Sequence, residues 1–485
     1  MDIKIKLKGD KVIEQIPSTK DKALRINLNE NIYGTFAEIG AGQETVRHFF
    51  RSGGSSGTIA KAMSAYDKDF SDAIYGVEVD GRYVTESRLR KMLTHETNLI
   101  ERRLSREKHP NKLFFSYANT VATIDFAKQF KGHGWVGIKF QIEPDEDYNE
   151  ITIHIRFKET DARLQQETLG ILGVNLIYGA FYKYNDPKKL LRYLYDHLDK
   201  DQLEIDTINF SGPRFADVDN RLMSLQLVKN GMTDAVMFDP EGKNILPAQI
   251  LYKKNILALR GSFRPVTKVN MDMYEKSLKT FLAESKVEKE NTLVVFEITL
   301  SNLRSEGEID ERDFMDRAEL LCSLGQTVMI SNFQEYYKVV EYFSAYTKAR
   351  MVLAMGVNNL VDIFDEKYYR HLSGGILEAF GKLFYRDLKV FLYPMLEDGE
   401  VIDSENLKVH PRMKELYKFF KFNGKVVDID DVDPHTLEVF SREVLKMIAN
   451  GKSGWEEMLP KGIAELIKQH QLFGYDPNKI LEETN

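Results

Sequence analysis

The stretch DAVMFDPEGKNILPAQILYKKNILALR, residues 234–260, decides which fold the central part of this chain adopts. It begins and ends with short apolar runs, DAVMF and NILALR, of the kind that forms buried strands. If LPAQILYKK between them folds as a helix, the two runs belong to a repeat of parallel strands and helices. If DPEG at 239–242 is a β-turn that begins a hairpin, this repeat is broken. The choice separates a closed barrel from an open sheet.

Apolar runs of this kind alternate with helical stretches through the central part of the chain, which indicates parallel α/β architecture. Eight such units fit a (β/α)8 barrel-like core over residues 146–395. The alternative is a doubly wound open parallel sheet, which becomes the better description if the unit at 234–260 is a hairpin. The eight runs are ITIHIRF (151–157), LEIDTINF (203–210), DAVMF (234–238), NILALR (255–260), NTLVVFEITL (291–300), QTVMIS (326–331), RMVLAM (350–355) and LKVFLY (388–393).

The regions on either side of this core, 1–145 and 396–485, are predicted to be mainly helical additions. Helical stretches of the first region are GTIAKAMSAY (57–66) and the charged ESRLRKMLTHETNLIERRLSREK (86–108), whose apolar residues recur near the helical period. GWVGIKFQ and SYANTVATIDF are expected to be strands of the same region. The C-terminal region is expected to form a helical cap or an assembly surface, and we expect a homo-oligomer.

Composition narrows the classes of partner. The net charge is −7 over 485 residues and the isoelectric point is about 5.9, so no bulk positive field attracts nucleic acid. The single cysteine, Cys322, and the lack of an apolar signal region in MDIKIKLKGD favour a cytoplasmic location. The apolar run at 169–182 is shorter than the ~20 residues that span a membrane and contains Asn175, so it predicts a buried helix and no membrane partner.

Polar side chains follow the predicted strands, at the edge where parallel sheets bind their ligands. A pocket there would take an anionic small molecule, phosphorylated or carboxylated, through arginines and short polar side chains. Each asparagine has a simpler explanation as a turn residue or helix cap. The candidate binding residues are Arg260, Ser262, Arg264, Asn302, Asn332 and Asn358.

Glu297 is the candidate catalytic residue, as general acid or base. It interrupts LVVFEITL, a run that is buried on both faces in a parallel sheet, and a buried carboxylate needs a partner, a metal ion or a raised pKa. The alternative is a structural salt bridge with Arg260 on the preceding strand. The sequence leaves both interpretations open.

The segment ALRGSFRPVT, residues 258–267, resembles the Gly-Ser-Phe-x-Pro part of the nicotinate-nucleotide adenylyltransferase signature. The resemblance implies a loop that holds the phosphates of ATP and an adenylyl transfer reaction. The family's following histidine is replaced in Arg264-Pro265-Val266-Thr267, and no Ser-x-Thr-x-x-Arg signature is present. Independently of the resemblance, two arginines that flank a glycine are a favourable arrangement for an anion.

Two glycine-rich stretches precede the core. EIGAGQE (38–44) lacks the third glycine of a dinucleotide-binding loop, because Thr45 stands at that position. RSGGSSGTIAK (51–61) is a candidate phosphate loop, and the alternative is a corner in which glycine ends a helix. Its candidate residues are Gly53, Gly54, Gly57, Thr58 and Lys61. No metal-binding spacing of histidines occurs, and no particular cofactor is indicated.

Longer segments, NIYGTFAEIGAGQETVRHFFRSGGSSGTIAKAMSAYDKDFSDAIYG, SGPRFADVDNRLMSLQLVKNGMTDA and RGSFRPVT, resemble a family of long bacterial cytoplasmic proteins of Bacteroidetes and cyanobacteria. Its members carry conflicting labels, nicotinate-nucleotide adenylyltransferase and TonB-dependent receptor. The resemblance implies a soluble protein and no particular mechanism. Three hypotheses follow: an enzyme for an anionic small molecule, a non-catalytic homo-oligomeric scaffold, and a nucleotidyltransferase.

Overall fold

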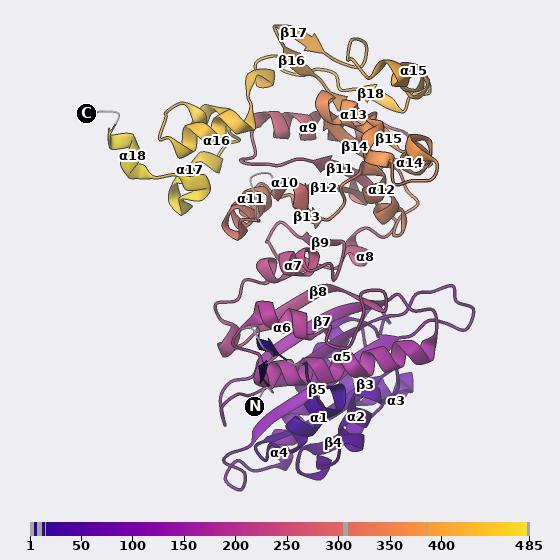
Figure 1. The fold of residues 1–485 in the computed structure, drawn as a ribbon, viewed down its shortest axis with the longest axis vertical. Coiled ribbons are helices and arrows are strands. Elements are labelled where there is room, and N and C mark those ends of the chain that lie inside the picture. The colour runs from indigo at the N-terminus through magenta and orange to yellow at the C-terminus, as the bar shows by residue number, and fades with distance from the viewer. Residues whose placement is uncertain (1–3, 7–11, 15, 304–308, 385, 483–485) are drawn as a thin grey trace. The chain divides into compact units, whose positions relative to one another are not determined.

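The computed structural model describes residues 4–6, 12–14, 16–303, 309–384 and 386–482. The chain divides into two compact units, Met1–Thr233 and Asp234–Asn485 (Figure 1). Each unit has its own main sheet, so each is described separately.

The sheet of the first unit has six strands in the order β4-β3-β5-β6-β7-β8. β3 pairs in parallel with β4 and with β5, whereas the pairs from β5 to β8 are antiparallel. The carboxyl ends of β4, β3 and β5 therefore lie at one edge. The strands are β3 (Ile32–Ile39), β4 (Ile59–Met63), β5 (Leu113–Ala122), β6 (His133–Phe140), β7 (Asn149–Phe157) and β8 (Leu203–Ser211), and β1 (Lys4–Lys6) and β2 (Val12–Glu14) form a separate hairpin.

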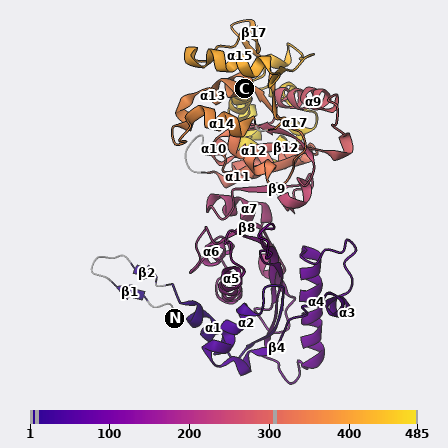
Figure 2. The ribbon, with the colours of Figure 1, turned by 90° about the vertical axis from the view of Figure 1, so that its right-hand side faces the viewer.

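Helices cover both faces of this sheet, with α4 and α3 on one side and α1, α2 and α5 on the other (Figure 2). Leu89 and Leu93 of α4 lie against Gly137 of β6, and Phe181 of α5 packs its ring against Phe115 and Phe140 on the opposite face. The helices are α1 (Thr19–Asn27), α2 (Glu44–Ser52), α3 (Lys68–Tyr75), α4 (Glu86–Arg103), α5 (Ala162–Tyr182), α6 (Pro187–Tyr193) and α7 (Asn220–Lys229), with short turns η1 (Ser55–Gly57) and η2 (Pro213–Phe215).

The apolar run at 169–182 is a buried helix, as the sequence predicts. Residues 172–181 of α5 are all buried, and Asn175 accepts a hydrogen bond from Lys22 Nζ (2.8 Å) and donates to the carbonyl oxygens of Leu194 and Asp196. No helix among the described residues combines the length and apolar character needed to cross a membrane.

The sheet of the second unit has eight strands in the order β10-β9-β13-β12-β11-β14-β15-β18. Six of them, from β13 to β18, pair in parallel, and β9 and β10 add an antiparallel edge. The strands are β9 (Ala235–Phe238), β10 (Asn244–Ile245), β11 (Asn255–Arg260), β12 (Thr292–Thr299), β13 (Thr327–Ser331), β14 (Met351–Gly356), β15 (Lys389–Tyr393) and β18 (Val426–Asp428). β16 (Met395–Glu397) and β17 (Glu400–Ile402) form a small hairpin.

Helices also cover both faces of the second sheet. Phe281 and Tyr274 of α9 pack on Phe391 and Phe296 of one face, while α12, α14 and α15 share an apolar core with the other. The helices are α8 (Pro247–Ile250), α9 (Lys268–Leu282), α10 (Leu300–Leu303), α11 (Glu311–Ser323), α12 (Tyr336–Ser344), α13 (Val357–Ile363), α14 (Gly375–Leu383), α15 (Lys414–Phe422), α16 (Ser441–Ala449), α17 (Ile463–His470) and α18 (Pro477–Glu482). Short turns are η3 (Lys289–Asn291), η4 (Glu366–Tyr369), η5 (Pro411–Met413), η6 (Thr436–Glu438), η7 (Trp455–Met458) and η8 (Leu472–Gly474).

The second sheet is open, because β10 and β18 at its two ends do not pair with each other, and the predicted barrel is not formed. The stretch at 234–260 begins with a hairpin: Asp239 N donates to Lys243 O (3.0 Å), and β9 and β10 pair antiparallel. The alternative prediction, an open doubly wound sheet, fits this unit. The strand order of its parallel part, third-second-first-fourth-fifth-sixth, is that of a doubly wound fold.

Two further expectations differ from the structure. The first two predicted barrel strands, ITIHIRF and LEIDTINF, are β7 and β8, which pair antiparallel in the first unit. The apolar alternation of a strand does not reveal the direction of its neighbour, which explains the error. GTIAKAMSAY contains the strand β4 in place of a helix, because pairing with β3 outweighs local helix propensity. The boundary expected between residues 145 and 146 lies between β6 and β7.

Candidate functional site

A cavity of about 300 Å³ opens at the carboxyl ends of the central strands of the second unit. In a doubly wound sheet the crossovers diverge beside the first strand, so a crevice forms at its carboxyl end. Here that strand is β11, between β12 and β14. The residues that line the cavity follow β11, β12, β13 and β14, and they are Arg260, Thr299, Ser301, Asn302, Gln334, Glu335, Tyr336, Asp362, Ile363, Tyr368 and Tyr369.

Arg260, the last residue of β11, is held by three hydrogen bonds. Its Nε and Nη2 donate to the two carboxylate oxygens of Glu297 (2.8 and 2.9 Å), and Nη1 donates to Gln334 O (3.1 Å). The guanidinium lies 4.3 Å from the centre of the Tyr336 ring. Burial lowers the pKa of Arg260, but the adjacent Glu297 carboxylate outweighs it, so the pKa is raised and the guanidinium stays charged.

Glu297 lies on β12 directly opposite Arg260 and is 1% exposed. Its Oε1 also accepts a hydrogen bond from Ser331 Oγ of β13 (2.6 Å), and it is not among the residues that line the cavity. Arg260 faces the cavity and Glu297 lies behind it. The predicted salt bridge between the two residues is therefore present, as a bidentate pair.

Two further carboxylates line the cavity, and sequence reasoning missed both. Glu335 is buried and lies 2.7 Å from Lys338 Nζ and 3.7 Å from His371 Nε2, whereas Asp362 is exposed. Burial raises the pKa of Tyr336 to about 12, so its hydroxyl group is a neutral donor or acceptor near pH 7. Since Glu335 pairs with Lys338, Asp362 is the exposed carboxylate of a cavity that Arg260 also lines.

The other predicted binding residues divide into one that lines the cavity and four that do not. Asn302 lines it, and its Oδ1 accepts hydrogen bonds from the backbone and the hydroxyl of Thr299 (3.2 and 2.7 Å). The side chains of the other four lie elsewhere: Ser262 is exposed, Arg264 pairs with Asp313 (2.5 Å), Asn332 is exposed, and Asn358 Nδ2 donates to Met395 Sδ (3.3 Å).

The Gly-Ser-Phe loop follows β11, the first parallel strand of the second unit. Phe263 folds back over Gly261, where a Cβ atom would lie 2.9 Å from the phenylalanine ring, and the ring packs on Phe296. Thr267 and Asn270 form a capping box at the start of α9. Thr267 lies in the segment where the adenylyltransferase family carries a histidine. In this structure it caps α9 and so stabilises that helix.

The glycine-rich loop at 51–61 is a closed corner in the first unit. Gly53 ends α2 with φ +86°, and Asn27 Nδ2 donates to its carbonyl oxygen (2.7 Å). The Thr58 hydroxyl donates to Asn27 O (3.1 Å), and Lys61 pairs with the buried Glu96 (2.6 Å). Gly54 and Gly57 lie in the turn between these anchors. These contacts match the helix-ending corner that the sequence left as the alternative.

A second cavity, of about 290 Å³, lies at the opposite, amino-terminal edge of the second sheet. Four cationic side chains and two acidic ones line it. They are Lys286, Lys348, Arg350 and Arg386, with Glu288 and Asp387. The helices α9, α12 and α14 run from the carboxyl edge back to this one, so cations here complement the negative ends of their dipoles.

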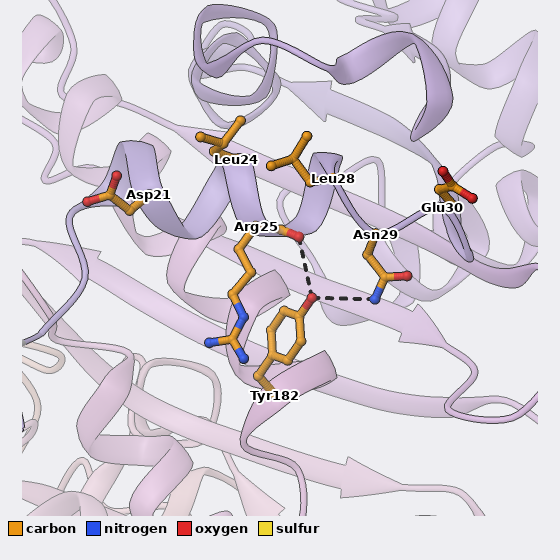
Figure 3. Close-up of a pocket in the computed structure, with 7 residues that line it drawn as sticks. All are labelled: Asp21, Leu24, Arg25, Leu28, Asn29, Glu30 and Tyr182. Carbon is orange, nitrogen blue, oxygen red and sulfur yellow. Dashed lines mark hydrogen bonds between the residues drawn. The ribbon is translucent and has the colours of Figure 1, made fainter. Parts of the chain in front are cut away.

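An open cavity of about 570 Å³ lies between α1 and the end of α5 in the first unit (Figure 3). The guanidinium of Arg25 lies 4.3 Å from the centre of the Tyr182 ring, and the Tyr182 hydroxyl accepts from Asn29 Nδ2 and donates to Arg25 O (3.4 Å each). Asp21 and Glu30 line the same cavity, and their negative charges are opposite to that of Arg25. It contains none of the residues that the sequence predicts as functional.

A chain of titratable side chains crosses β6, β7 and β8 of the first sheet. His154 Nδ1 lies 2.6 Å from Asp206 Oδ1, and His154 Nε2 lies 3.2 Å from His133 Nδ1. Burial, and then the neighbouring His154, lower the pKa of His133 to about 4. With its pKa lowered to about 4, the imidazole of His133 is neutral near pH 7.

The lowered pKa of His133 predicts that the first unit loses stability in acid. Since the folded-state pKa of His133 lies below its ordinary value of 6.5, its contribution to stability is present above about pH 6.5 and is lost as the pH falls toward 4. We expect the free energy of unfolding, followed by the fluorescence of Trp135 in a Trp455→Phe background, to decline over this range. His133→Phe should flatten the decline, and an unchanged slope in that variant would contradict the assignment.

Among the residues that the structure describes, no group of three or more histidine, cysteine, aspartate or glutamate side chains is placed to hold a metal ion.

Comparison with known proteins finds partial similarity to two kinds of solved structure. The competence/damage inducible protein CihA from Agrobacterium tumefaciens is 13% identical, with 34% of this chain and 97% of that chain covered and a TM-score of 0.23. The CinA superfamily protein KP700603 from Klebsiella pneumoniae 700603 is 12% identical over 36% and 96%, with a TM-score of 0.25. Nicotinic acid mononucleotide adenylyltransferase from Plasmodium falciparum is 13% identical over 46% and 98%, with a TM-score of 0.30. At these TM-scores the similarities assign no function.

No family model matches the chain, and no curated protein matches it.

Proposed function

We propose that the second unit binds and acts on a small molecule that carries both an anionic group and hydroxyl groups, in the cavity at the carboxyl ends of β11 to β14. One observation carries this proposal: Glu297 and Gln334 hold the Arg260 guanidinium in place by hydrogen bonds, and Arg260 still lines the cavity. Glu297 and Gln334 take three of its five N–H donors, which leaves two for a phosphate or carboxylate oxygen.

The carboxylates of the cavity refine the class of ligand. Glu335 and Asp362 accept hydrogen bonds, so they favour the hydroxyl groups of a sugar over a second anionic group. The rings of Tyr336, Tyr368 and Tyr369 offer flat apolar surface beside these polar groups. A sugar phosphate or a nucleotide combines the features that this lining recognises.

The geometry favours a division of roles between the acids. Glu297 is enclosed by Arg260 and Ser331, so we assign it to positioning the guanidinium, whereas the sequence left acid–base catalysis and a structural salt bridge both open. Glu335 and Asp362 face the cavity and are the carboxylates that we propose for proton transfer to or from the ligand.

A thermal-shift and calorimetric test uses ribose 5-phosphate, AMP and inorganic phosphate as probes. We expect the two sugar phosphates to raise the melting temperature of the wild type. Arg260→Lys, which keeps the charge but not the bidentate fork, should weaken binding about tenfold or more, in line with the ~1.5–3 kcal/mol of a charge-assisted hydrogen bond. Asp362→Asn should weaken binding of the sugar phosphates and leave that of inorganic phosphate unchanged.

The cationic cavity at the amino-terminal edge supplies the matched control. Lys348→Ala removes one of its exposed charges and should leave the affinity for both sugar phosphates unchanged. The proposal is wrong if Lys348→Ala abolishes binding while Arg260→Lys does not, or if none of the three probes binds the wild type.

Adenylyl transfer is a second candidate function, favoured by the position of the Gly-Ser-Phe loop after the first parallel strand, where a doubly wound sheet binds phosphates. Its test is release of pyrophosphate from ATP and nicotinate mononucleotide in the presence of Mg²⁺. Formation of the dinucleotide would support this candidate, and its absence under conditions where AMP binds would restrict the loop to a binding or structural role.

A further inference from the structure

The first unit exposes six large apolar side chains on three segments, which we call the edge patch. Val79 and Phe126 are 105% and 106% exposed, so they extend as far into solvent as they would in an unfolded chain. Exposed apolar side chains of this size are ordinary when scattered, but a group of them on one surface marks an interaction site. The edge patch consists of Tyr66 and Phe70, Val77 and Val79, and Phe126 and Phe130.

The three segments meet at the carboxyl edge of β4, β3 and β5. The segment after β4 is tied there by the Tyr66 hydroxyl, which donates to Gly40 O just beyond β3 (3.3 Å). The segment between α3 and α4 is tied by Tyr83 O, which accepts from Thr120 Oγ1 near the end of β5 (2.6 Å). The third segment, 123–132, leaves β5 directly. The three segments therefore emerge at the same edge of the sheet, although the patch residues span 65 positions of the sequence, from Tyr66 to Phe130.

The charges within the patch have two parts of opposite sign. Asp72 and Glu78 pair with the buried Arg88, and the other charged side chains around α3 and the segment after it are three acids (Asp67, Asp69 and Asp80) and two cations (Lys68 and Arg82). On the segment 123–132, Lys128 and Lys131 outnumber Asp125. The patch as a whole has four acids and four cations. A neutral patch has no net attraction for an anionic membrane, whereas a surface with an acidic half and a basic half is complementary to itself.

We propose that the edge patch docks against the same patch of a second copy of this chain, in an isologous dimer. A twofold axis sets the basic segment 123–132 of one copy against the acidic α3 segment of the other, and the same contact occurs twice. Phe126 and Phe130 are buried at the centre of the interface, and the lysines and aspartates form its rim.

The first experiment measures the mass of the full-length protein by sedimentation over a range of concentrations. We expect a dimer at micromolar concentration. Phe126→Ser should weaken dimerisation about tenfold or more, because truncation of a central aromatic side chain removes an anchor of the interface. Phe422→Ser is the matched control: Phe422 is 92% exposed on α15 of the second unit, and its replacement should leave the dimer unchanged.

Charge reversal tests the pairing of the two halves. Lys128→Glu and Asp69→Lys should each weaken the dimer, and the double variant should recover it, because each reversed charge then faces an opposite charge on the other copy. Both side chains are exposed, so the folded unit tolerates these changes, and unchanged melting temperatures verify this.

Three outcomes would overturn the proposal. A wild type that stays monomeric at every concentration excludes the dimer, and an equal loss of dimer in Phe126→Ser and Phe422→Ser places the interface elsewhere. A monomer that binds phosphatidylserine vesicles through Phe126 assigns the patch to a membrane instead. Recovery of the dimer in the charge-swapped double variant would distinguish this interface from non-specific hydrophobic association.

Discussion

Replacement of Arg260 by alanine is expected to lower the free energy of unfolding of the second unit by about 3–5 kcal/mol, because it leaves the carboxylate of Glu297 buried without its partner. Glu297 is 1% exposed, and among the hydrogen bonds of the described residues only that from the Ser331 hydroxyl then remains to its carboxylate. The loss is measured by urea unfolding, with the fluorescence of Trp455 as the probe in a Trp135→Phe background. Each unit has one of the two tryptophans, so this background reports the second unit alone.

Two controls separate this effect from the mere loss of a charge. Lys418→Ala removes an exposed ion pair with Glu415 on α15 of the same unit and should cost less than about 1 kcal/mol. The double replacement Arg260→Met and Glu297→Met should recover most of the loss, since it leaves no charge buried alone. A cost for Arg260→Ala as small as that of Lys418→Ala would show that water reaches Glu297 and that the pair is not buried.

This expected cost also governs how binding is tested. A variant that unfolds loses binding for a trivial reason, which is why Arg260→Lys, with its charge retained opposite Glu297, is the informative replacement for ligand affinity. Asp362 lies at the surface of the same cavity and has no comparable structural partner among the described contacts, so Asp362→Asn reports on binding at little cost in stability.

The strands of the second unit can be predicted from the sequence because they are continuous apolar runs, which is the pattern of a sheet covered on both faces. DAVMF, NILALR, NTLVVFEITL, QTVMIS, RMVLAM and LKVFLY all coincide with strands. What the runs do not encode is the partner of each strand. ITIHIRF and LEIDTINF have the same local pattern, yet hairpin connections pair them antiparallel in the first unit. The turn DPEG is the local sequence signal against a closed barrel, and in the structure it connects the hairpin strands β9 and β10.

The candidate site was predictable in part for a similar reason. Arg260 and Asn302 follow strands, and the rule that ligands bind at carboxyl ends places them at the cavity. Glu335, Asp362 and Tyr368 lie several residues beyond their strands, on or next to the helices α12, α13 and η4. Their approach to Arg260 depends on how those helices pack, which no local spacing specifies. Arg264 was predicted to bind ligand on its proximity in sequence, but Asp313 of α11 engages it.

Replacement of Gly40 by alanine is expected to destabilise the first unit by about 2–6 kcal/mol, from a positive-φ backbone of ~1–3 kcal/mol and a steric clash of similar size. Gly40 has φ +95°, and a Cβ atom there would lie 1.7 Å from the carbonyl oxygen of Val121 on β5. The clash is with backbone of a paired strand, so no side-chain rotation relieves it. The same turn brings Glu38 under α2, where its carboxylate accepts from Thr45 N and Val46 N (3.2 and 2.9 Å).

Gly42, two residues further on, is the matched control for this change. It also has positive φ, +73°, but the nearest atom to an added Cβ is Gln166 Oε1 at 3.8 Å, so Gly42→Ala should cost only the backbone strain of about 1–2 kcal/mol. Urea unfolding followed by Trp135 in a Trp455→Phe background measures both variants. Equal losses would mean that strain alone explains both glycines, whereas a larger loss at Gly40 identifies close packing against β5 as the reason for the first glycine of EIGAGQE.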